Sequence, residues 1–133
     1  MRDKPQELNA QVVDEQANGW RPDSAAHRSD KTITICVTDG RSKHKTHRLK
    51  KSRATIGRMG GGADMQVDDS DVSPVHCAVA IAQEGVRIYD LESANGTYVD
   101  DEQIEMADLE NLAVFRLGST EFVVLIVPKV DGA

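Results

Sequence analysis

The stretch HCAVAIAQEGVRIYDLESANGTYV, residues 76–99, is the part of this chain that indicates its fold class most clearly. Apolar side chains alternate with small ones from residue 77 to residue 81, and a period of two is typical of a half-buried strand. A hairpin turn at 83–85 leads into a second alternating segment. Asn95-Gly96 then predicts a tight turn, because both residues tolerate positive φ. The stretch therefore indicates short strands joined by turns.

Similar alternating segments flank this stretch on both sides, so the whole domain is predicted to be all-β. Residues 122–127 are apolar at every position, and we expect them to be buried on both faces of a sheet. Residues 106–111 are compatible with one helical turn. The alternating segments suit two packed sheets with roughly ten strands in all. Outside 76–99, the predicted strand segments are 33–37, 44–50, 53–57, 65–67, 112–117 and 122–127.

Length and composition indicate one ordinary globular domain. The chain has 133 residues, of which 39% are hydrophobic and 29% charged, as expected for one folded domain with at most a tail. We divide it into a flexible, polar N-terminal arm (1–30), the β-sandwich domain (31–128) and a short tail (129–133). Met1 to Ala10 lacks the apolar stretch of a secretory signal, and no apolar run approaches the length of a membrane span. We therefore expect a cytoplasmic protein without a membrane partner.

No cofactor or metal is predicted. Cys36 and Cys77 lie in alternating segments, where a cysteine usually behaves as a small buried hydrophobe. His76 and Cys77 are adjacent on a strand and cannot point into one metal site. The glycines at 60–62 are not followed by the Gly-Lys-Ser/Thr of a nucleotide-binding loop.

Four aspartates near those glycines raise the question of a calcium site. They lack the terminal glutamate and central glycine of the helix–loop–helix calcium motif. We therefore expect solvated loop acids; the four are Asp64, Asp68, Asp69 and Asp71.

Charge is unevenly distributed along the chain. The net charge is −6, yet residues 41–53 contain seven lysines and arginines and no acid. This run suits a solvated strand and turn face and a functional electropositive rim equally well. A nucleic-acid partner is not expected, because the whole chain is acidic and no aromatic platform accompanies the basic residues.

Three predicted loops carry side chains that bind anions and peptides. Arg58 follows Gly57 at a strand end, and a guanidinium matches two phosphate oxygens at once. Ser73 offers a hydroxyl donor, and the amide of Asn95 both donates and accepts. Each also has a plain structural interpretation, as a surface arginine after a turn glycine or as part of an ordinary Asn-Gly turn.

His76 lies between apolar neighbours, so its ring is expected to point into the fold and brace the loop by hydrogen bonding. A nucleophilic Ser73–His76 pair is disfavoured, because no strand–turn elbow surrounds the serine and no orienting carboxylate is marked. We therefore predict a protein that is not an enzyme.

Three segments in this order resemble the signature of the forkhead-associated (FHA) family: TIGR (55–58), VSPVH (72–76) and DLESANGTYV (90–99). The similarity spans roughly residues 32–127. It implies an eleven-stranded, two-sheet β-sandwich of the FHA and SMAD type, whose loops at one end bind phosphothreonine. By position, it implies that Arg58 and Ser73 contact the phosphate and that Asn95 holds the peptide backbone. The loop-supporting positions that it implies are Gly57, His76 and Gly96.

Two positions depart from the family pattern. Pro74 offers neither a polar side chain nor a backbone N–H, and Ala94 lacks the hydroxyl that many members have before Asn-Gly. Both departures are expected to reduce affinity. The alternative function is accordingly a phosphate-independent scaffold or assembly domain with a degenerate site.

Some small bacterial relatives insert their own phosphorylated N-terminal threonine into the site. Residues 1–31 contain no threonine here, and only Ser24 and Ser29 are available for modification. The resemblance therefore implies a partner protein or peptide phosphorylated on threonine and bound in trans.

Overall fold

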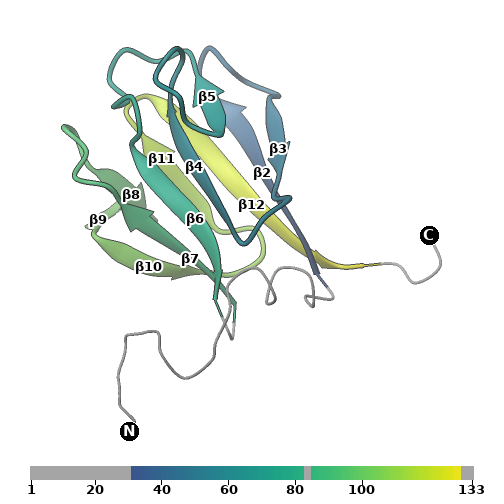
Figure 1. The fold of residues 1–133 in the computed structure, drawn as a ribbon. Coiled ribbons are helices and arrows are strands. Elements are labelled where there is room, and N and C mark those ends of the chain that lie inside the picture. The colour runs from purple at the N-terminus through teal and green to yellow at the C-terminus, as the bar shows by residue number, and fades with distance from the viewer. Residues whose placement is uncertain (1–30, 83–84, 130–133) are drawn as a thin grey trace, which may run out of the picture.

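The computed structural model describes residues 31–82 and 85–129, and it forms an all-β sandwich (Figure 1). The predicted N-terminal arm lies outside the described residues, as does most of the predicted tail. The described strands are β2 (Lys31–Asp39), β3 (Thr46–Arg48), β4 (Arg53–Arg58), β5 (Met65–Val67), β6 (Cys77–Ala82), β7 (Gly85–Asp90), β8 (Thr97–Val99), β9 (Glu102–Ile104), β10 (Met106–Leu109), β11 (Val114–Leu117) and β12 (Thr120–Pro128).

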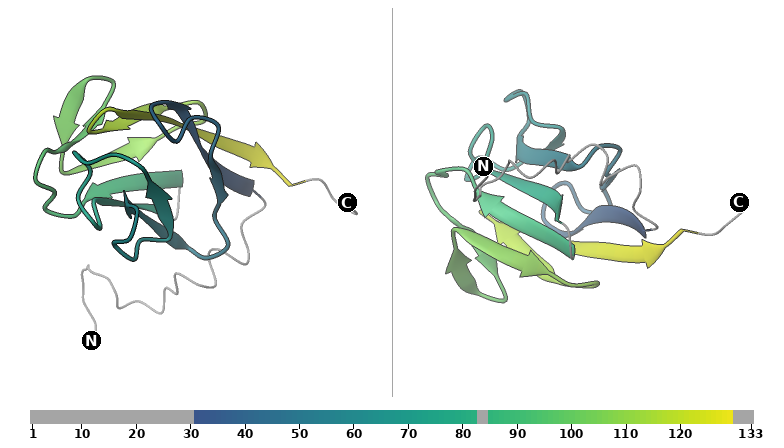
Figure 2. Two further views of the ribbon diagram at one scale, coloured as in Figure 1. Left: turned by 90° about the horizontal axis from the view of Figure 1, so that it is seen from above. Right: turned by 60° about the horizontal axis from the view of Figure 1, so that its bottom comes forward.

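The strands form two sheets that face each other. One sheet has five strands in the order β10-β7-β6-β4-β5, and the other has six in the order β3-β2-β12-β11-β8-β9. Figure 2 shows the layers from above, with yellow β12 and blue β2 in one and teal β4 and β6 in the other. These eleven strands confirm the predicted two-sheet sandwich. No helix among the described residues has the length and hydropathy needed to span a membrane.

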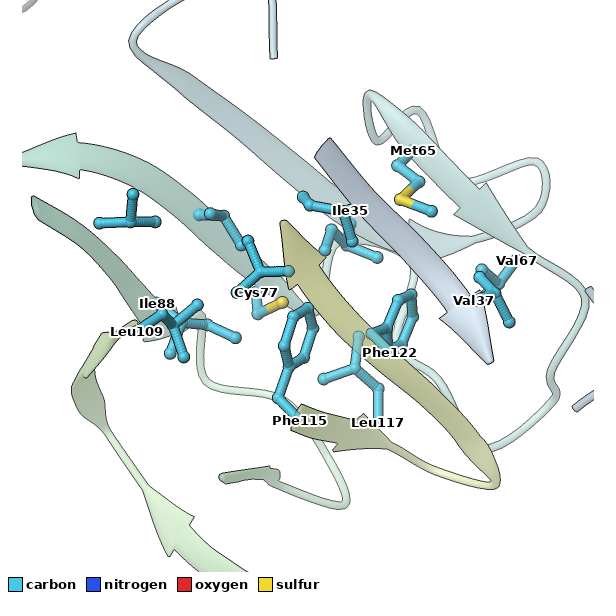
Figure 3. Packing of buried hydrophobic residues seen from close by; sticks show 14 of the residues in the cluster. Ile35, Val37, Met65, Val67, Cys77, Ile88, Leu109, Phe115, Leu117 and Phe122 are labelled. Carbon is cyan, nitrogen blue, oxygen red and sulfur yellow. The ribbon is translucent and has the colours of Figure 1, made fainter. Parts of the chain in front are cut away.

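The core fills the space between the sheets with the inward side chains of alternating segments (Figure 3). Ile33, Ile35 and Val37 are buried on one face of β2, as the period of two predicted. Phe115 and Phe122 face each other from β11 and β12, with stacked rings 4.7 Å apart between centroids. Two sheets joined by such a core form a rigid support for the loops at their ends.

Two predictions about strands were wrong. Residues 106–111 do not form a helical turn, because Met106 to Leu109 pair with β7 as the edge strand β10. Strand β12 is buried on one face only: Phe122 is fully buried, whereas Val127 is 45% exposed. In the described part of the chain, no third layer covers the outer face of the six-stranded sheet. Cys36 lies half-buried on β2, and only Cys77 is fully buried, where burial raises its thiol pKa.

The tight hairpin turn also lies elsewhere than predicted. Of Asn95 and Gly96, only the glycine has positive φ, at 91°. The turn in which both central residues have positive φ is Asp100-Asp101, with values of 51° and 67°, between β8 and β9. Asp tolerates this conformation less commonly than Gly, so the Asp pair was a weak sequence signal.

Candidate functional site

Three loops meet at one end of the sandwich: the β4–β5 loop (59–64), the β5–β6 loop (68–76) and the β7–β8 loop (91–96). The backbone N–H of Arg58 donates to the carbonyl of Ser73 at 3.0 Å, and that of His76 donates to Ile56 at 2.8 Å. On the other side, the N–H of Leu91 donates to the carbonyl of His76 at 2.9 Å. The β5–β6 loop is therefore held between the ends of β4 and β7.

Gly57 permits the close approach of the β5–β6 loop to β4. A Cβ atom at this position would lie 1.9 Å from the carbonyl oxygen of Pro74 and 2.6 Å from its carbonyl carbon. Both are backbone atoms, so no side-chain rotation relieves the overlap. Gly61 fits the other side of Pro74 closely as well, since a Cβ atom there would lie 2.6 Å from the Pro74 oxygen and 2.7 Å from the Pro74 Cβ. Nothing in the sequence indicated this role for the glycine run.

We expect Gly57→Ala to destabilise the protein by about 2–4 kcal/mol, because the added methyl forces backbone strain or loop displacement. Urea unfolding would measure the change. Gly85→Ala is the matched control, since its Cβ would meet no atom within 4 Å and its φ is not positive. Equal unfolding free energies for the two variants would contradict the packing role of Gly57.

His76 is fully buried and joins two of the loops through its ring. Its Nδ1 accepts the backbone N–H of Ser73 at 3.0 Å, and its Nε2 lies 2.9 Å from the carbonyl oxygen of Gly96. Because the first partner is a donor and the second an acceptor, both bonds require the neutral ring with its proton on Nε2. The ring thus joins the β5–β6 loop, which bears Ser73, to the β7–β8 loop, which bears Asn95 and Gly96.

Arg58 and Ser73 each use only part of their hydrogen-bonding capacity within the protein. The exposed guanidinium of Arg58 donates through Nη1 to the carbonyl of Val72 at 3.2 Å. The guanidinium of Arg58 makes no other hydrogen bond or ion pair among the described residues, so its remaining donors are available. The half-buried hydroxyl of Ser73 accepts the backbone N–H of Ala94 at 3.0 Å, which leaves its own proton to donate.

Asn95 is exposed, and its side chain spans two loops. Its Nδ2 donates to the carbonyl of Asp71 at 2.9 Å. This contact fixes the amide and leaves its oxygen free to accept a hydrogen bond from a peptide N–H. The three predicted contact residues therefore lie on adjoining segments that are hydrogen-bonded to one another.

Asp90 shapes the β7–β8 loop, a role that the sequence did not reveal. Its carboxylate accepts the hydroxyls of Ser93 and Thr97 at 2.5 and 2.7 Å and the backbone N–H of Ser93 at 3.2 Å. The Ser93 hydroxyl in turn accepts the N–H of Gly96 at 2.9 Å. Burial raises the pKa of Asp90, but the hydrogen bonds outweigh burial and hold the pKa below its usual value.

Asp69 anchors the β5–β6 loop to the opposite sheet. Its carboxylate accepts the N–H groups of Asp71 and Ser119 at 2.9 and 2.8 Å and the hydroxyl of Thr120 at 2.7 Å. Burial raises the pKa of Asp69, but these bonds outweigh it and lower the pKa overall. Gly118, with φ of 55°, gives the carboxylate close access to the β11–β12 turn.

The prediction of solvated loop acids was therefore wrong for Asp69. Asp64 is an exposed loop acid, as predicted, and it also accepts the backbone N–H of Thr55 at 2.9 Å; this bond lowers the pKa of Asp64 against the effect of burial. No cluster of three potential metal-ligating side chains occurs within residues 31–82 and 85–129. The acids of this region hold loops in place.

These lowered pKa values predict acid sensitivity. A carboxyl whose folded pKa lies below the unfolded value of about 3.9 stabilises the fold fully above that pH and loses its contribution as pH falls through the folded pKa. We expect the unfolding free energy of the protein to decrease below about pH 4. We expect Asp69→Asn to have a lower unfolding free energy at neutral pH. Its unfolding free energy should also decrease less steeply in acid, because one carboxylate that stabilises the fold is already absent. Denaturant titrations at several pH values would measure both effects.

Asp100→Asn is the control for this measurement, since Asp100 is exposed and its carboxylate accepts no hydrogen bond within the described part of the chain. It also keeps the turn, because Asn tolerates the positive φ of this position. An Asp69→Asn profile parallel to that of the unsubstituted protein would contradict the anchoring role.

The first half of the basic run borders the site. The β2–β3 loop contacts the β5–β6 loop through Arg41, whose Nη1 lies 3.9 Å from a carboxylate oxygen of Asp68. The Asp68 N–H donates to the hydroxyl of Ser42 at 2.9 Å, and the Lys45 ammonium donates to the carbonyl of Gln66. Positive charge thus adjoins the β5–β6 loop.

Comparison with known proteins agrees with this architecture. A family model described as the cytoplasmic domain of the inner membrane component of the type III secretion system matches residues 36–127. The FHA domain-containing protein FhaA of Mycobacterium tuberculosis is 30% identical over 93 residues, which cover 70% of this chain and 17% of that protein. The chain therefore corresponds to a small part of that relative.

Comparison with solved structures also finds similarity to FHA domains. A domain from a study of phosphothreonine-dependent FHA interactions is 30% identical, with a TM-score of 0.65 over 73% of this chain and 98% of that one. The FhaA FHA domain in complex with the intracellular domain of Rv3910 is 30% identical, with a TM-score of 0.61 over 69% and 98%. The FHA domain of CT664 from Chlamydia trachomatis is 25% identical, with a TM-score of 0.65 over 71% and 96%.

Proposed function

This chain belongs to the forkhead-associated family, and we therefore propose that it is a non-enzymatic module that binds a partner protein through phosphothreonine. The solved relative described as phosphothreonine-dependent supports this class of ligand. So does the FhaA domain solved with an intracellular domain of another protein. The cytoplasmic location remains a prediction from the sequence.

One observation carries the proposal: the loop that bears Ser73 is held between the strand that bears Arg58 and the loop that bears Asn95. Each of these side chains is oriented by one internal hydrogen bond and has further capacity. In the proposed complex, Arg58 and the Ser73 hydroxyl donate to the phosphate oxygens. Asn95 accepts a backbone N–H of the peptide. Such pre-orientation limits the side-chain entropy lost on binding.

The hydrogen bonds of His76 support a binding role rather than catalysis. Its Nδ1 accepts the backbone N–H of Ser73, not the hydroxyl, and its Nε2 is paired with Gly96. Neither ring nitrogen is positioned to remove a proton from the Ser73 side chain. Ser73 and His76 therefore lack the geometry of a nucleophile and its base.

Isothermal titration calorimetry with a degenerate phosphothreonine peptide library tests the proposal. We expect saturable binding that disappears with the unphosphorylated library and weakens with phosphoserine. The methyl group of threonine is the only difference between the two phosphorylated libraries, so their comparison isolates residue preference. Absence of binding up to about 1 mM peptide, equivalent to about −4 kcal/mol, would reject the proposal.

A phosphate-independent scaffold is the second candidate. It is favoured by the family model, which describes the cytoplasmic domain of a component of the type III secretion system, and by Pro74 and Ala94, which supply no side-chain donor to the site. Affinity pull-down before and after phosphatase treatment separates the two functions. Partners that persist after treatment support the scaffold, and loss of every partner rejects it.

A further inference from the structure

A second cationic site lies at the other end of the sandwich. A pocket of about 180 Å³ opens there between the two sheets, and it is lined by five cationic residues together with Thr32 and apolar side chains. Ile33, Leu49 and Ile81 form its apolar part and belong to the core or pack against it. None of the lining residues that the structure describes is acidic or aromatic; the described cations are Lys31, Arg48, Lys50, Lys51 and Lys129.

Three of the lining cations, at 48, 50 and 129, are not neutralised by any acid among the described residues. The two ion pairs between described residues, Arg41–Asp68 and Arg87–Asp108, involve none of the lining cations. Lys51 is near enough to Asp64 to lower the pKa of that carboxyl. The lining cations at 48, 50 and 129 have no ion pair or side-chain hydrogen bond within the described part of the chain. Such a concentration of positive charge in a protein of net charge −6 attracts anions locally.

This pocket is separate from the loop site. Lys31 and Lys129 lie at the start of β2 and just after β12, the end of the sandwich away from the β2–β3 loop. Strand β2 runs nine residues from Lys31 to Asp39, a length of about 27 Å. Figure 1 shows the start of β2 and the end of β12 at the lower right and the β2–β3 connection at the top. The fold thus divides the basic run: its first cations border the loop site, and 48–51 line the pocket.

We propose that this pocket binds a multiply charged phosphate group, as carried by a soluble polyphosphate or by an anionic phospholipid headgroup. Its volume is below the range of about 300–1,000 Å³ common for drug-sized ligands, so it suits one compact anionic group. Ammonium and guanidinium groups donate charge-assisted hydrogen bonds to phosphate oxygens. A nucleic acid would require an extended basic or aromatic surface, and the lining within 31–82 and 85–129 contains no aromatic residue.

The test measures binding of sodium tripolyphosphate by calorimetry and by amide NMR shifts. A parallel arm measures sedimentation with phosphatidylcholine vesicles that contain or lack phosphatidic acid. We expect tripolyphosphate to shift amides at 31–33, 48–51 and 129, with affinity that decreases as salt is added. Sedimentation with phosphatidic acid identifies a lipid headgroup as a ligand, and binding of tripolyphosphate alone identifies a soluble one. No binding in either arm overturns the proposal.

Charge reversals locate the binding. We expect Lys50→Glu and Lys129→Glu each to weaken anion binding about tenfold or more, because each removes a charge-assisted contact and adds repulsion. Lys43→Glu changes net charge equally within the same basic run but does not line the pocket, and it should change affinity less than about twofold.

Equal weakening by all three variants would overturn the proposal in favour of a net-charge effect. Loss of tripolyphosphate binding in Arg58→Ala would overturn it in favour of the loop site. All lining residues to be substituted are exposed, so the variants should unfold at unchanged denaturant concentrations. Because phosphopeptide binding should also remain unchanged in Lys50→Glu, the outcome is independent of the proposed function.

Discussion

Arg58→Ala should reduce phosphothreonine-peptide affinity by at least about thirtyfold, because a charge-assisted hydrogen bond contributes about 1.5–3 kcal/mol and a guanidinium can form two with one phosphate. Ser73 supplies one neutral hydroxyl, and Pro74 and Ala94 supply no side-chain donor. Arg58 therefore provides most of the specific attraction to the dianion. Calorimetry with one phosphopeptide selected from the library would measure the loss.

Arg53→Ala is the matched control for this experiment. Arg53 and Arg58 are exposed residues at opposite ends of the same strand, β4. Both substitutions remove one positive charge, so long-range attraction decreases similarly, whereas only Arg58 borders the serine loop. We expect affinity to change less than about twofold in Arg53→Ala. Equal losses in the two variants, or none in Arg58→Ala, would exclude Arg58 as the phosphate contact.

His76→Ala should destabilise the fold by about 3–5 kcal/mol, since it creates a buried cavity and leaves two buried backbone groups without partners. The groups are the N–H of Ser73 and the carbonyl of Gly96. A loss of this size is a large fraction of the total stability of about 5–15 kcal/mol that small domains have. Urea unfolding monitored by circular dichroism would measure it.

Two further substitutions separate the hydrogen bonds of His76 from histidine loss in general. His47→Ala alters a half-buried histidine on β3 with no side-chain hydrogen bond among described residues, and we expect a loss below about 1 kcal/mol. His76→Gln retains an acceptor and a donor and should recover part of the stability lost in His76→Ala. A stability of His76→Ala equal to that of His47→Ala would contradict the bracing role.

The sandwich was predictable because its core positions alternate along each segment. Residues 33–37 show the period of two, and burial against the opposite sheet follows it directly. In 77–81 the apolar residues Cys77 and Val79 are buried as the pattern predicts, but Ala78 is buried as well. The edge strand β10 was not predictable in the same way, since two of its four residues are exposed and its pairing with β7 decides its conformation. The apolar run 122–127 misled for a related reason: apolar composition does not specify whether another layer covers the outer face.

The candidate site was likewise predictable from the sequence only in part. Arg58, Ser73 and Asn95 were identified from residue types and their order, and the fold places them on adjoining segments. The anchoring by Asp69 had no local signal, because its partners at 119 and 120 are fifty residues away in sequence.

Residue patterns were sufficient to establish an all-β sandwich with an arginine, a serine and an asparagine at its loops, since strand periodicity and turn chemistry act between near neighbours. Folding in three dimensions was needed to show that the serine loop is clamped through His76 and Asp69 and that the basic run divides between two ends of the molecule. These features depend on which distant segments meet when the two sheets pack. Contacts between distant segments do not follow from local sequence preferences. They form because the folded chain must bury its apolar side chains and satisfy its buried hydrogen-bonding groups.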